Sequence, residues 1–285
     1  DEGQTSCDDA DAGYYVDTMA ATDQTACDPG TYQPSTGQTA CIDASAGYYV
    51  DTTAATSQTA CVAGTYQAST GQTSCDDADA GYYVSTTAAT SQTACAAGTY
   101  QPSTGQSSCT DASAGYYVST TAATSQTACL AGTYNPNTAS SSSSDCVDAS
   151  AGYYVASAGS ASQTACAAGT YQASTAQTSC IDASAGYYVD TTAATSQTAC
   201  PAGTYNPNTG SSDSSACIEA AEGYYVPNAG SASQTACSLG TYQSDEGQTS
   251  CDDADAGYYV DTMAATDQTA CDPGTYQPST GQTAC

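Results

Sequence analysis

The chain of 285 residues contains no Lys, Arg, His, Phe or Trp, and its 29 acidic residues give a formal charge of −29. Without Lys or Arg it has no footprint for nucleic acid, because such footprints neutralise phosphates with basic side chains. Without His or Lys it has no imidazole proton shuttle and no Schiff-base amine, which are essential parts of most enzyme mechanisms. We therefore predict that the chain is not an enzyme and does not bind nucleic acid.

Large aliphatic side chains are also scarce, with 2 Leu, 3 Ile, 10 Val and 2 Met in the whole chain. Together with a high net charge, such a composition is typical of disordered proteins. The 17 cysteines indicate the opposite. Thiols at this density pair into disulfides in an oxidising compartment, so the sequence predicts a disulfide scaffold that is secreted or lies on the cell surface.

Targeting signals are absent from the sequence. No run of about 18 apolar residues could span a bilayer. Residue 1 is Asp, and no basic segment precedes an apolar stretch as it would in a signal peptide. We expect a mature segment, or an internal window of a longer protein, without a transmembrane segment.

The cysteines recur with a period of 34 residues. Steps of 20 and 14 residues alternate except for two steps of 17, so two of the units have 37 residues. Seven units span residues 1–244, and residues 245–285 repeat residues 1–41 without a difference. We predict a seven-unit super-repeat over 1–244, the start of the next identical super-repeat over 245–285, and no globular domain.

Each unit consists of two half-units of 17 residues, because an offset of 17 superimposes Gly on Gly and Tyr on Tyr along the chain. In this alignment Ala44 occupies the position of Cys27, and Gln58 occupies the position of Cys41. Both cysteines are thus absent together from every second half-unit. This joint absence is expected if the two cysteines are disulfide partners.

Two sequential disulfide registers are possible: one closes the steps of 14 or 17 residues, and the other closes the steps of 20, as from Cys7 to Cys27. If a half-unit loses both of its cysteines, all remaining cysteines keep their partners only in the first register. We therefore prefer the first register. Cys7 would then pair with a cysteine upstream of residue 1, whereas a Cys7–Cys27 link would favour the second register. The first register predicts Cys27–Cys41, Cys61–Cys75, Cys95–Cys109, Cys129–Cys146, Cys166–Cys180, Cys200–Cys217, Cys237–Cys251 and Cys271–Cys285.

The pattern C-x-x-G-x-Y, followed by a short loop with Gly and a closing Cys, as from Cys61 to Cys75, resembles the ephrin-receptor-like cysteine-rich repeats, which are related to TNF-receptor modules. The likeness covers the whole chain. It implies a disulfide from the first Cys of each loop to the Cys that closes it, in agreement with the first register. The C-x-x-C of the family is reduced to a single Cys here, as at Cys41, so alternate modules lack a disulfide. This departure weighs against receptor-like ligand binding.

The repeats are too small to be stable singly. Closing a loop of about 15 residues contributes roughly 3 kcal/mol, whereas ordering about 34 residues costs on the order of 34–68 kcal/mol in backbone entropy. Single units should therefore depend on their neighbours, as in solenoids. Tyr-Tyr-Val and Thr favour strands, Gly and Asn-Pro-Asn mark turns, and no helical period is present.

The expected fold class is therefore small, disulfide-rich, β and irregular, with little helix. We predict an elongated tandem-repeat ladder or solenoid of short hairpin-like modules. Tyrosine rings are expected to pack between these modules. Oxidative cross-linking could also explain regularly spaced tyrosines, but core packing is the better explanation in a chain that has no other aromatic residue. The residues predicted to pack in the first units are Tyr14, Tyr15, Tyr32, Tyr48, Tyr49 and Tyr66.

The two long loops, residues 129–146 and 200–217, share further changes. Both contain Thr-Tyr-Asn-Pro-Asn-Thr, and each is followed by Ala-Gly-Ser-Ala-Ser-Gln-Thr in place of the usual Thr-Ala-Ala-Thr-Ser-Gln-Thr. One hypothesis is that the longer loop packs against the next half-unit or against another array. Duplication of one variant unit explains the same pattern equally well.

Candidate chemistry is limited to oxygen groups. The cluster Asp8, Asp9 and Asp11 could coordinate Ca²⁺, but it lacks the EF-hand spacing, and solvated charge is the better interpretation. We expect no cofactor, although diffuse divalent cations could screen the charge. The chain is rich in Ser and Thr and has no N-x-[ST] sequence, so O-glycans on the loops are expected and N-glycans are not.

The sequence favours an extracellular structural protein of a microbe that self-associates to form or coat a filament, sheath or surface appendage. A linear module without Lys or Arg also resists trypsin-like proteases. The alternative is the stalk of a cell-surface adhesin or receptor-like binding protein, which would hold a recognition domain away from the cell.

Overall fold

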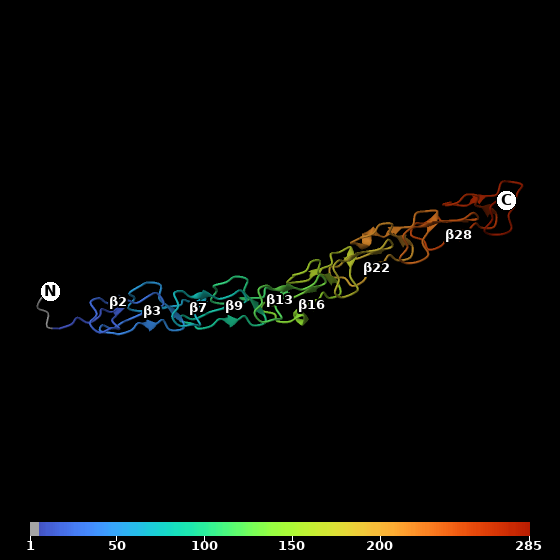
Figure 1. Ribbon diagram of the computed structural model, residues 1–285. Coiled ribbons are helices and arrows are strands. Elements are labelled where there is room, and N and C mark those ends of the chain that lie inside the picture. Colours follow the sequence, from blue (N-terminus) through green and yellow to red (C-terminus); the bar gives the residue numbers. More distant parts are fainter. Residues whose placement is uncertain (1–5) are drawn as a thin grey trace. The chain divides into compact units, whose positions relative to one another are not determined.

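The computed structural model describes residues 6–285 of the chain. The chain forms two bodies, the first made of Asp1–Cys129 and Asn135–Cys146, and the second of Leu130–Tyr134 and Val147–Cys285. Both bodies are built from the same element, an antiparallel hairpin of two two-residue strands, and successive hairpins are short and lie in chain order (Figure 1). The first body contains β1 to β14 and the second contains β15 to β30.

Half-units without cysteine form one kind of hairpin. The Tyr-Tyr pair after the glycine is the first strand, and the Thr-Ala pair at the end of the half-unit is the second, so that Tyr48 lies opposite Ala60. β-favouring Tyr and Thr thus flank a loop rich in turn residues. These strands are β1 (Tyr14–Tyr15), β2 (Thr25–Ala26), β5 (Tyr48–Tyr49), β6 (Thr59–Ala60), β9 (Tyr82–Tyr83), β10 (Thr93–Ala94), β13 (Tyr116–Tyr117), β14 (Thr127–Ala128), β17 (Tyr153–Tyr154), β18 (Thr164–Ala165), β21 (Tyr187–Tyr188), β22 (Thr198–Ala199), β25 (Tyr224–Tyr225), β26 (Thr235–Ala236), β29 (Tyr258–Tyr259) and β30 (Thr269–Ala270).

Half-units with cysteine form the other kind. Thr-Tyr after the glycine pairs with the two residues that follow the closing cysteine, so that Tyr32 lies opposite Ile42. These strands are β3 (Thr31–Tyr32), β4 (Ile42–Asp43), β7 (Thr65–Tyr66), β8 (Asp76–Asp77), β11 (Thr99–Tyr100), β12 (Thr110–Asp111), β15 (Thr133–Tyr134), β16 (Val147–Asp148), β19 (Thr170–Tyr171), β20 (Ile181–Asp182), β23 (Thr204–Tyr205), β24 (Ile218–Glu219), β27 (Thr241–Tyr242) and β28 (Asp252–Asp253).

Backbone hydrogen bonds join each half-unit to the next. The N–H of Gly30 donates to the carbonyl of Val50 at 2.8 Å, and the N–H of Gln33 donates to the carbonyl of Ala55 at 3.0 Å. In the opposite direction, the N–H of Ala54 donates to the carbonyl of Cys27 at 2.8 Å. The same bonds recur one half-unit later with Gly47 as the first donor, and so on along each body. Each half-unit is therefore held mainly by its neighbours.

In most of the described half-units, the glycine before the strand tyrosine is required by close approach of the backbone. Gly47 has φ +86°, and a Cβ on it would collide with the carbonyl of Ala88, which belongs to the half-unit two further along the chain. A side chain at this point would be strained and would also push the neighbouring turn away. Stacking thus reaches beyond the adjacent half-unit.

The core of each body consists of two columns of small side chains. One column alternates Cys and Ala, as at Cys27 and Ala44, which are both 0% exposed. The other alternates Val with Gln or Asn, as at Val50 and Gln33, which are both 3% exposed. The tyrosines of the strands are half-buried along both bodies, except near residue 285, where Tyr258 and Tyr276 are exposed. The buried columns are therefore made of Cys, Ala and Val with one amide side chain in each cysteine half-unit except the last, whereas the tyrosines are only half-buried.

Eight disulfides each close the loop within one of the half-units that contain cysteine. They join Cys27–Cys41, Cys61–Cys75, Cys95–Cys109, Cys129–Cys146, Cys166–Cys180, Cys200–Cys217, Cys237–Cys251 and Cys271–Cys285, with Cα–Cα distances of 5.6–5.8 Å. These are the pairs of the first register. Among residues 6–285 only Cys7 is outside a disulfide, and it is exposed.

Helix is limited to two short 3₁₀ turns in the described residues, η1 (Ser143–Asp145) and η2 (Ser214–Ala216), one in each long loop. The predicted fold class is confirmed: small, strand-rich, disulfide-bonded modules follow one another in tandem with almost no helix. Over residues 6–285, no helix is long and apolar enough to cross a membrane. The division at residues 1–244 and 245–285 remains a prediction from the sequence.

Candidate functional site

A glutamine closes the loop in every half-unit that lacks cysteine. The Oε1 atom of Gln58 accepts a hydrogen bond from the N–H of Ser45 at 2.6 Å. Ser45 directly follows Ala44, the residue that replaces the first cysteine, and Gln58 replaces the second. Alternate modules therefore lack the covalent bond, as predicted, but a hydrogen bond between the same two points takes its place. The eight closing residues are Gln24, Gln58, Gln92, Gln126, Gln163, Gln197, Gln234 and Gln268.

This role of glutamine was not predicted from the sequence. The available signal was its position, because a glutamine stands wherever the second cysteine is missing. Three of the glutamines form a second bond, as where Nε2 of Gln92 donates to Oδ2 of Asp79 at 2.6 Å. A hydrogen bond to a charged acceptor is stronger than a neutral one.

Buried amides hold the loops of the cysteine half-units. Nε2 of Gln33 donates to the carbonyl of Ala40 at 2.7 Å, and its Oε1 accepts from the N–H of Ser35 at 3.2 Å. Side-chain polar atoms buried in the described residues all have partners. A buried amide with both ends bonded avoids the cost of an unpaired polar group and fixes one loop conformation.

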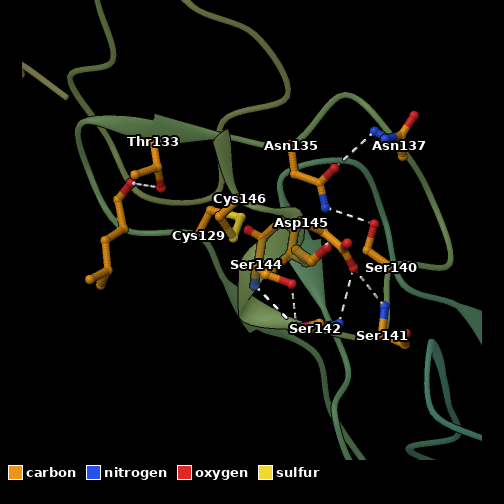
Figure 2. The surroundings of a disulfide bond; sticks show 12 residues. Cys129, Thr133, Asn135, Asn137, Ser140, Ser141, Ser142, Ser144, Asp145 and Cys146 are labelled. Carbon is orange, nitrogen blue, oxygen red and sulfur yellow. Dashed lines mark hydrogen bonds between the residues drawn. A yellow bond between two sulfur atoms is a disulfide. The ribbon is translucent and has the colours of Figure 1, made fainter. Parts of the chain in front are cut away.

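Asparagine replaces this glutamine in the two long loops. Nδ2 of Asn135, which is fully buried, donates to Oγ of Ser140 at 2.8 Å and to the carbonyl of Tyr116 at 3.1 Å. Figure 2 shows Asn135 pointing toward Ser140 near the disulfide of Cys129 and Cys146. The shorter amide thus bonds to a residue before the insertion instead of after it, which explains why Asn accompanies the longer loop.

The inserted residues form hydrogen bonds among themselves. The Asp145 carboxylate accepts from the N–H groups of Ser141 and Ser142, and Oγ of Ser142 accepts from the N–H of Ser144 (Figure 2). In the second insertion, hydrogen bonds from Ser215 lower the pKa of Asp213. Local bonds of this kind cap the short 3₁₀ turns. In the described residues of the second body, no hydrogen bond joins the second insertion to the half-unit that follows it.

One residue of the change that follows the second long loop is Gly230. The Tyr187 hydroxyl lies 2.8 Å from the place that a Cβ would take on this residue, which has φ +76°. Ala occupies the equivalent position in most cysteine-free half-units, for example at Ala54 and Ala193. Glycine therefore accompanies the insertion here because the tyrosine of an earlier half-unit fills the space of the methyl group.

The predicted acidic candidates Asp8, Asp9 and Asp11 line one open hollow of about 870 Å³. They differ in their surroundings: Oδ2 of Asp11 accepts from Gln24, whereas the carboxyl of Asp9 lies beside Gly37. Within residues 6–285, no three Cys, Asp or Glu side chains are grouped so that they could hold a metal ion.

Each unit has one exposed carboxylate, four residues before the glycine of a cysteine-free half-unit. We call this set of residues the carboxylate column. The carboxyl carbon of Asp43, for example, lies 3.6 Å from the place a Cβ would take on Gly71 in the next cysteine loop. These side chains form no hydrogen bond with other described residues. The carboxylate column consists of Asp9, Asp43, Asp77, Asp111, Asp148, Asp182, Glu219 and Asp253.

Tyrosine lies two residues after the glycine in every half-unit, and a second tyrosine precedes it in the cysteine-free half-units. Tyr14, Tyr15, Tyr32, Tyr48, Tyr49 and Tyr66, the predicted packing residues, are all half-buried. At Tyr242, burial and the negative charges of Asp255, Asp252 and Asp267 raise the pKa of the phenol. Half-buried rings of this kind have an apolar body for packing and a hydroxyl that remains in contact with water.

Exposed aliphatic side chains lie beside some of these rings. Ile42 is 45% exposed and lies directly opposite Tyr32 in its hairpin. Val147, Ile181 and Ile218 occupy the same position in later cysteine half-units, where other units have Asp or Thr. These exposed residues are single and separated along the chain, so they do not by themselves mark an interface.

Two stretches of the chain, residues 13–61 and 223–271, match the family described as tyrosine-protein kinase ephrin type A/B receptor-like. Each match begins at the glycine of a cysteine-free half-unit and ends at the first cysteine of a later half-unit. The comparison with curated proteins finds no match. The resemblance inferred from the cysteine and tyrosine pattern is therefore confirmed.

Repeats of this family are not enzymatic domains. The disulfides and the receptor-like repeats together indicate an extracellular or secreted protein, because disulfides at this density persist in oxidising compartments.

Proposed function

We propose that this chain, in which residues 13–61 and 223–271 are ephrin-receptor-like repeats, is the repeat region of an extracellular structural protein that forms or coats a filament, sheath or surface appendage. The supporting observation is that the same backbone hydrogen bonds recur between successive half-units within each of the two bodies. Such a set allows repeats to be added without a change of register, which is how solenoid arrays extend.

The mode of closure also suits a structural role outside the cell. Half of the half-units are closed by a disulfide, as at Cys61–Cys75, and the others by a glutamine, as at Gln92. The glutamine closures need no oxidant, while the disulfides restrict the unfolded chain. The absence of Lys and Arg removes every site for trypsin-like proteases.

Self-association has to overcome the charge of the chain. With 29 acidic and no basic residues, two copies repel each other and cannot form intermolecular ion pairs between side chains. Lateral contacts would depend on tyrosines, hydrogen bonds, sugars or divalent cations that screen the carboxylates. We therefore expect assembly to strengthen as ionic strength or the concentration of Ca²⁺ rises.

Electron microscopy of the native material tests this proposal, with sedimentation of the purified chain at low salt, high salt and millimolar Ca²⁺ as a second measurement. Filaments or sheaths that contain the chain, and larger species at high salt or with Ca²⁺, are expected. Dispersed monomers under all three conditions, and none of the chain in native fibres, would contradict a filament role.

The alternative function is a stalk that carries a binding domain of an adhesin or receptor-like protein. The match of residues 13–61 and 223–271 to receptor-like repeats favours it. A unique globular domain joined to the repeats in the full-length protein would support the stalk. Uninterrupted repeats with contacts between chains would support the filament.

A further inference from the structure

The cysteine half-units contain two sets of threonines that differ in their hydroxyl groups. In the first set, the turn threonines, the hydroxyl donates to the backbone carbonyl three residues earlier, as from Thr65 to Val62 at 2.9 Å. All but Thr275 are half-buried. The turn threonines are Thr31, Thr65, Thr99, Thr133, Thr170, Thr204, Thr241 and Thr275.

The second set, the loop threonines, lies five residues further along the same half-units. These residues are exposed, and their hydroxyls form no hydrogen bond with any other described residue. The seventh cysteine half-unit, which contains the disulfide Cys237–Cys251, has Glu246 at this position instead. The loop threonines are Thr36, Thr70, Thr104, Thr138, Thr175, Thr209 and Thr280.

The backbone around these hydroxyls is held in place. Nε2 of Gln72 donates to the carbonyl of Thr70 at 3.0 Å, and the N–H of Ser69 donates to Oε1 of the buried Gln67 at 3.1 Å. The loop is thus anchored on both sides, while the threonine side chain lies in solvent. An exposed hydroxyl on a fixed loop is accessible to a modifying enzyme without prior unfolding of the module.

A carboxylate without a hydrogen-bond partner lies next to most of these loops. The carboxyl carbon of Asp43 lies 3.6 Å from the Cβ position of Gly71, the residue after Thr70. The same arrangement places Asp77 next to Gly105, which follows Thr104. In most of these loops, a carboxylate able to accept hydrogen bonds therefore lies beside the residue that follows the loop threonine.

The charge of the chain selects the kind of modification. A phosphate on a loop threonine would add about −1.5 to −2 charges at neutral pH. It would lie beside a carboxylate, in a chain of net charge −29 without a single basic residue to pair with it. A neutral sugar adds no charge, and its hydroxyl groups can donate hydrogen bonds to that carboxylate, which are stronger than bonds between neutral groups.

We propose that the loop threonines are sites of O-glycosylation by neutral sugars, and that the neighbouring carboxylates bind and orient the attached sugar. In the transfer, Oγ of the threonine forms a bond to the anomeric carbon of a nucleotide-activated sugar. The bond from that carbon to the phosphate oxygen breaks, the nucleotide leaves with the electron pair, and a base of the transferase takes the hydroxyl proton. The turn threonines do not react, because their hydroxyls are already bonded and mostly half-buried.

Glycopeptide mapping of the native protein tests the proposal. Chymotrypsin-like cleavage after tyrosine provides the peptides that trypsin cannot, since the chain has no Lys or Arg. It also places each turn threonine, such as Thr65, and its loop threonine, Thr70, on different peptides, because Tyr66 lies between them. Electron-transfer fragmentation then assigns the modified residue, and release by alkaline β-elimination identifies the sugar.

The expected result is a neutral sugar on the loop threonines and none on the turn threonines. The half-unit with Glu246 is an internal control, and it should lack a sugar at that position. Unmodified loop threonines, equal occupancy of the two sets, or phosphate in place of sugar would each overturn the proposal. The glycosylation proposal does not depend on the filament role. Sugars on the loop threonines of a monomeric stalk would still support it. Filaments without these sugars would contradict the glycosylation proposal and leave the filament role intact.

Discussion

The side-chain oxygen of Gln58 accepts a hydrogen bond from the backbone N–H of Ser45 at 2.6 Å, at the place where the disulfide Cys27–Cys41 lies one half-unit earlier. The two closures alternate along the chain and join equivalent points of the same loop. The module therefore does not need a covalent cross-link in every half-unit, because a cysteine-free half-unit such as that of Gln58 lies between two disulfide-bonded ones and shares their backbone hydrogen bonds.

Replacing the closing glutamine should weaken its half-unit locally. We expect Gln58→Ala to lower the local unfolding free energy by about 0.5–1.5 kcal/mol, the net value of one hydrogen bond. Faster hydrogen exchange at the amide of Ser45 would measure this. Thr53→Ala is the control, because the exposed Thr53 hydroxyl forms no hydrogen bond with other described residues. Equal exchange in both variants would show that the glutamine does not close the loop.

A disulfide should form where the glutamine now closes the loop. Ala44 is fully buried, as is Cys27, so the double variant Ala44→Cys, Gln58→Cys places two thiols in the environment of a native pair. We expect no increase in titratable thiols relative to the parent chain, and a stabilisation of about 3 kcal/mol for a loop of this length. Each single variant should add one thiol. Two free thiols in the folded double variant would contradict the equivalence of the closures.

The disulfide register can be read from a peptide map without reduction. Cleavage after tyrosine separates Cys61 from Cys75, because Tyr66 lies between them. The structure predicts a disulfide-linked pair of peptides ending at Tyr66 and Tyr82. The second register would instead link the peptide that ends at Tyr66 to the one that contains Cys41. Recovery of the latter pair would require a different fold for every cysteine half-unit.

Gly230 and Tyr187 should be energetically coupled. Gly230→Ala places a methyl group 2.8 Å from the Tyr187 hydroxyl, so we expect it to destabilise the half-unit by about 1–3 kcal/mol, as overpacking does. Because φ is also +76°, part of the cost arises from backbone strain. Tyr187→Phe, which removes the hydroxyl, should recover the remaining part in a double-mutant cycle measured by local hydrogen exchange. Strict additivity of the two substitutions would argue against this contact.

The hairpin of β27 and β28 should lose stability at alkaline pH. Burial and the charges of Asp255, Asp252 and Asp267 raise the pKa of Tyr242 in the folded chain, so the unfolded chain releases this proton at lower pH. The contribution of Tyr242 is fully present below its unfolded pKa and is lost as the pH rises through the folded value. Hydrogen exchange in the hairpin between pH 9 and 11 should show the loss, with Tyr242→Phe as the control that removes it.

Tandem organisation follows from the sequence directly. The spacing of cysteines, the half-period of 17 residues and the alternation of Cys with Ala depend only on positions along the chain. Short strands and turns could also be predicted, since Tyr, Thr and Gly have strong local preferences that act within a few residues. The likeness to receptor-like repeats rests on the same short spacings, and residues 13–61 and 223–271 confirm it.

The composition of the core could not be predicted in this way. Tyrosine was the expected packing residue because it is the only large aromatic side chain. Only the stack of half-units shows that the buried columns are formed by small side chains such as Ala44 and Val50, with buried amides such as Gln33. The tyrosines of the strands are only half-buried.

By itself, the sequence determined the repeat, the absence of basic side chains and the pairs of half-units that could share a disulfide. The tertiary structure decided how the cysteine-free loops close, where Tyr187 requires glycine at position 230, and which threonine hydroxyls remain unbonded. The physical reason is distance along the chain. Composition and local spacing act within a half-unit. The closing hydrogen bond and the contact of Tyr187 with Gly230 join residues that are 13 or more positions apart. Whether a threonine hydroxyl is exposed depends on which side of its loop the next loop covers.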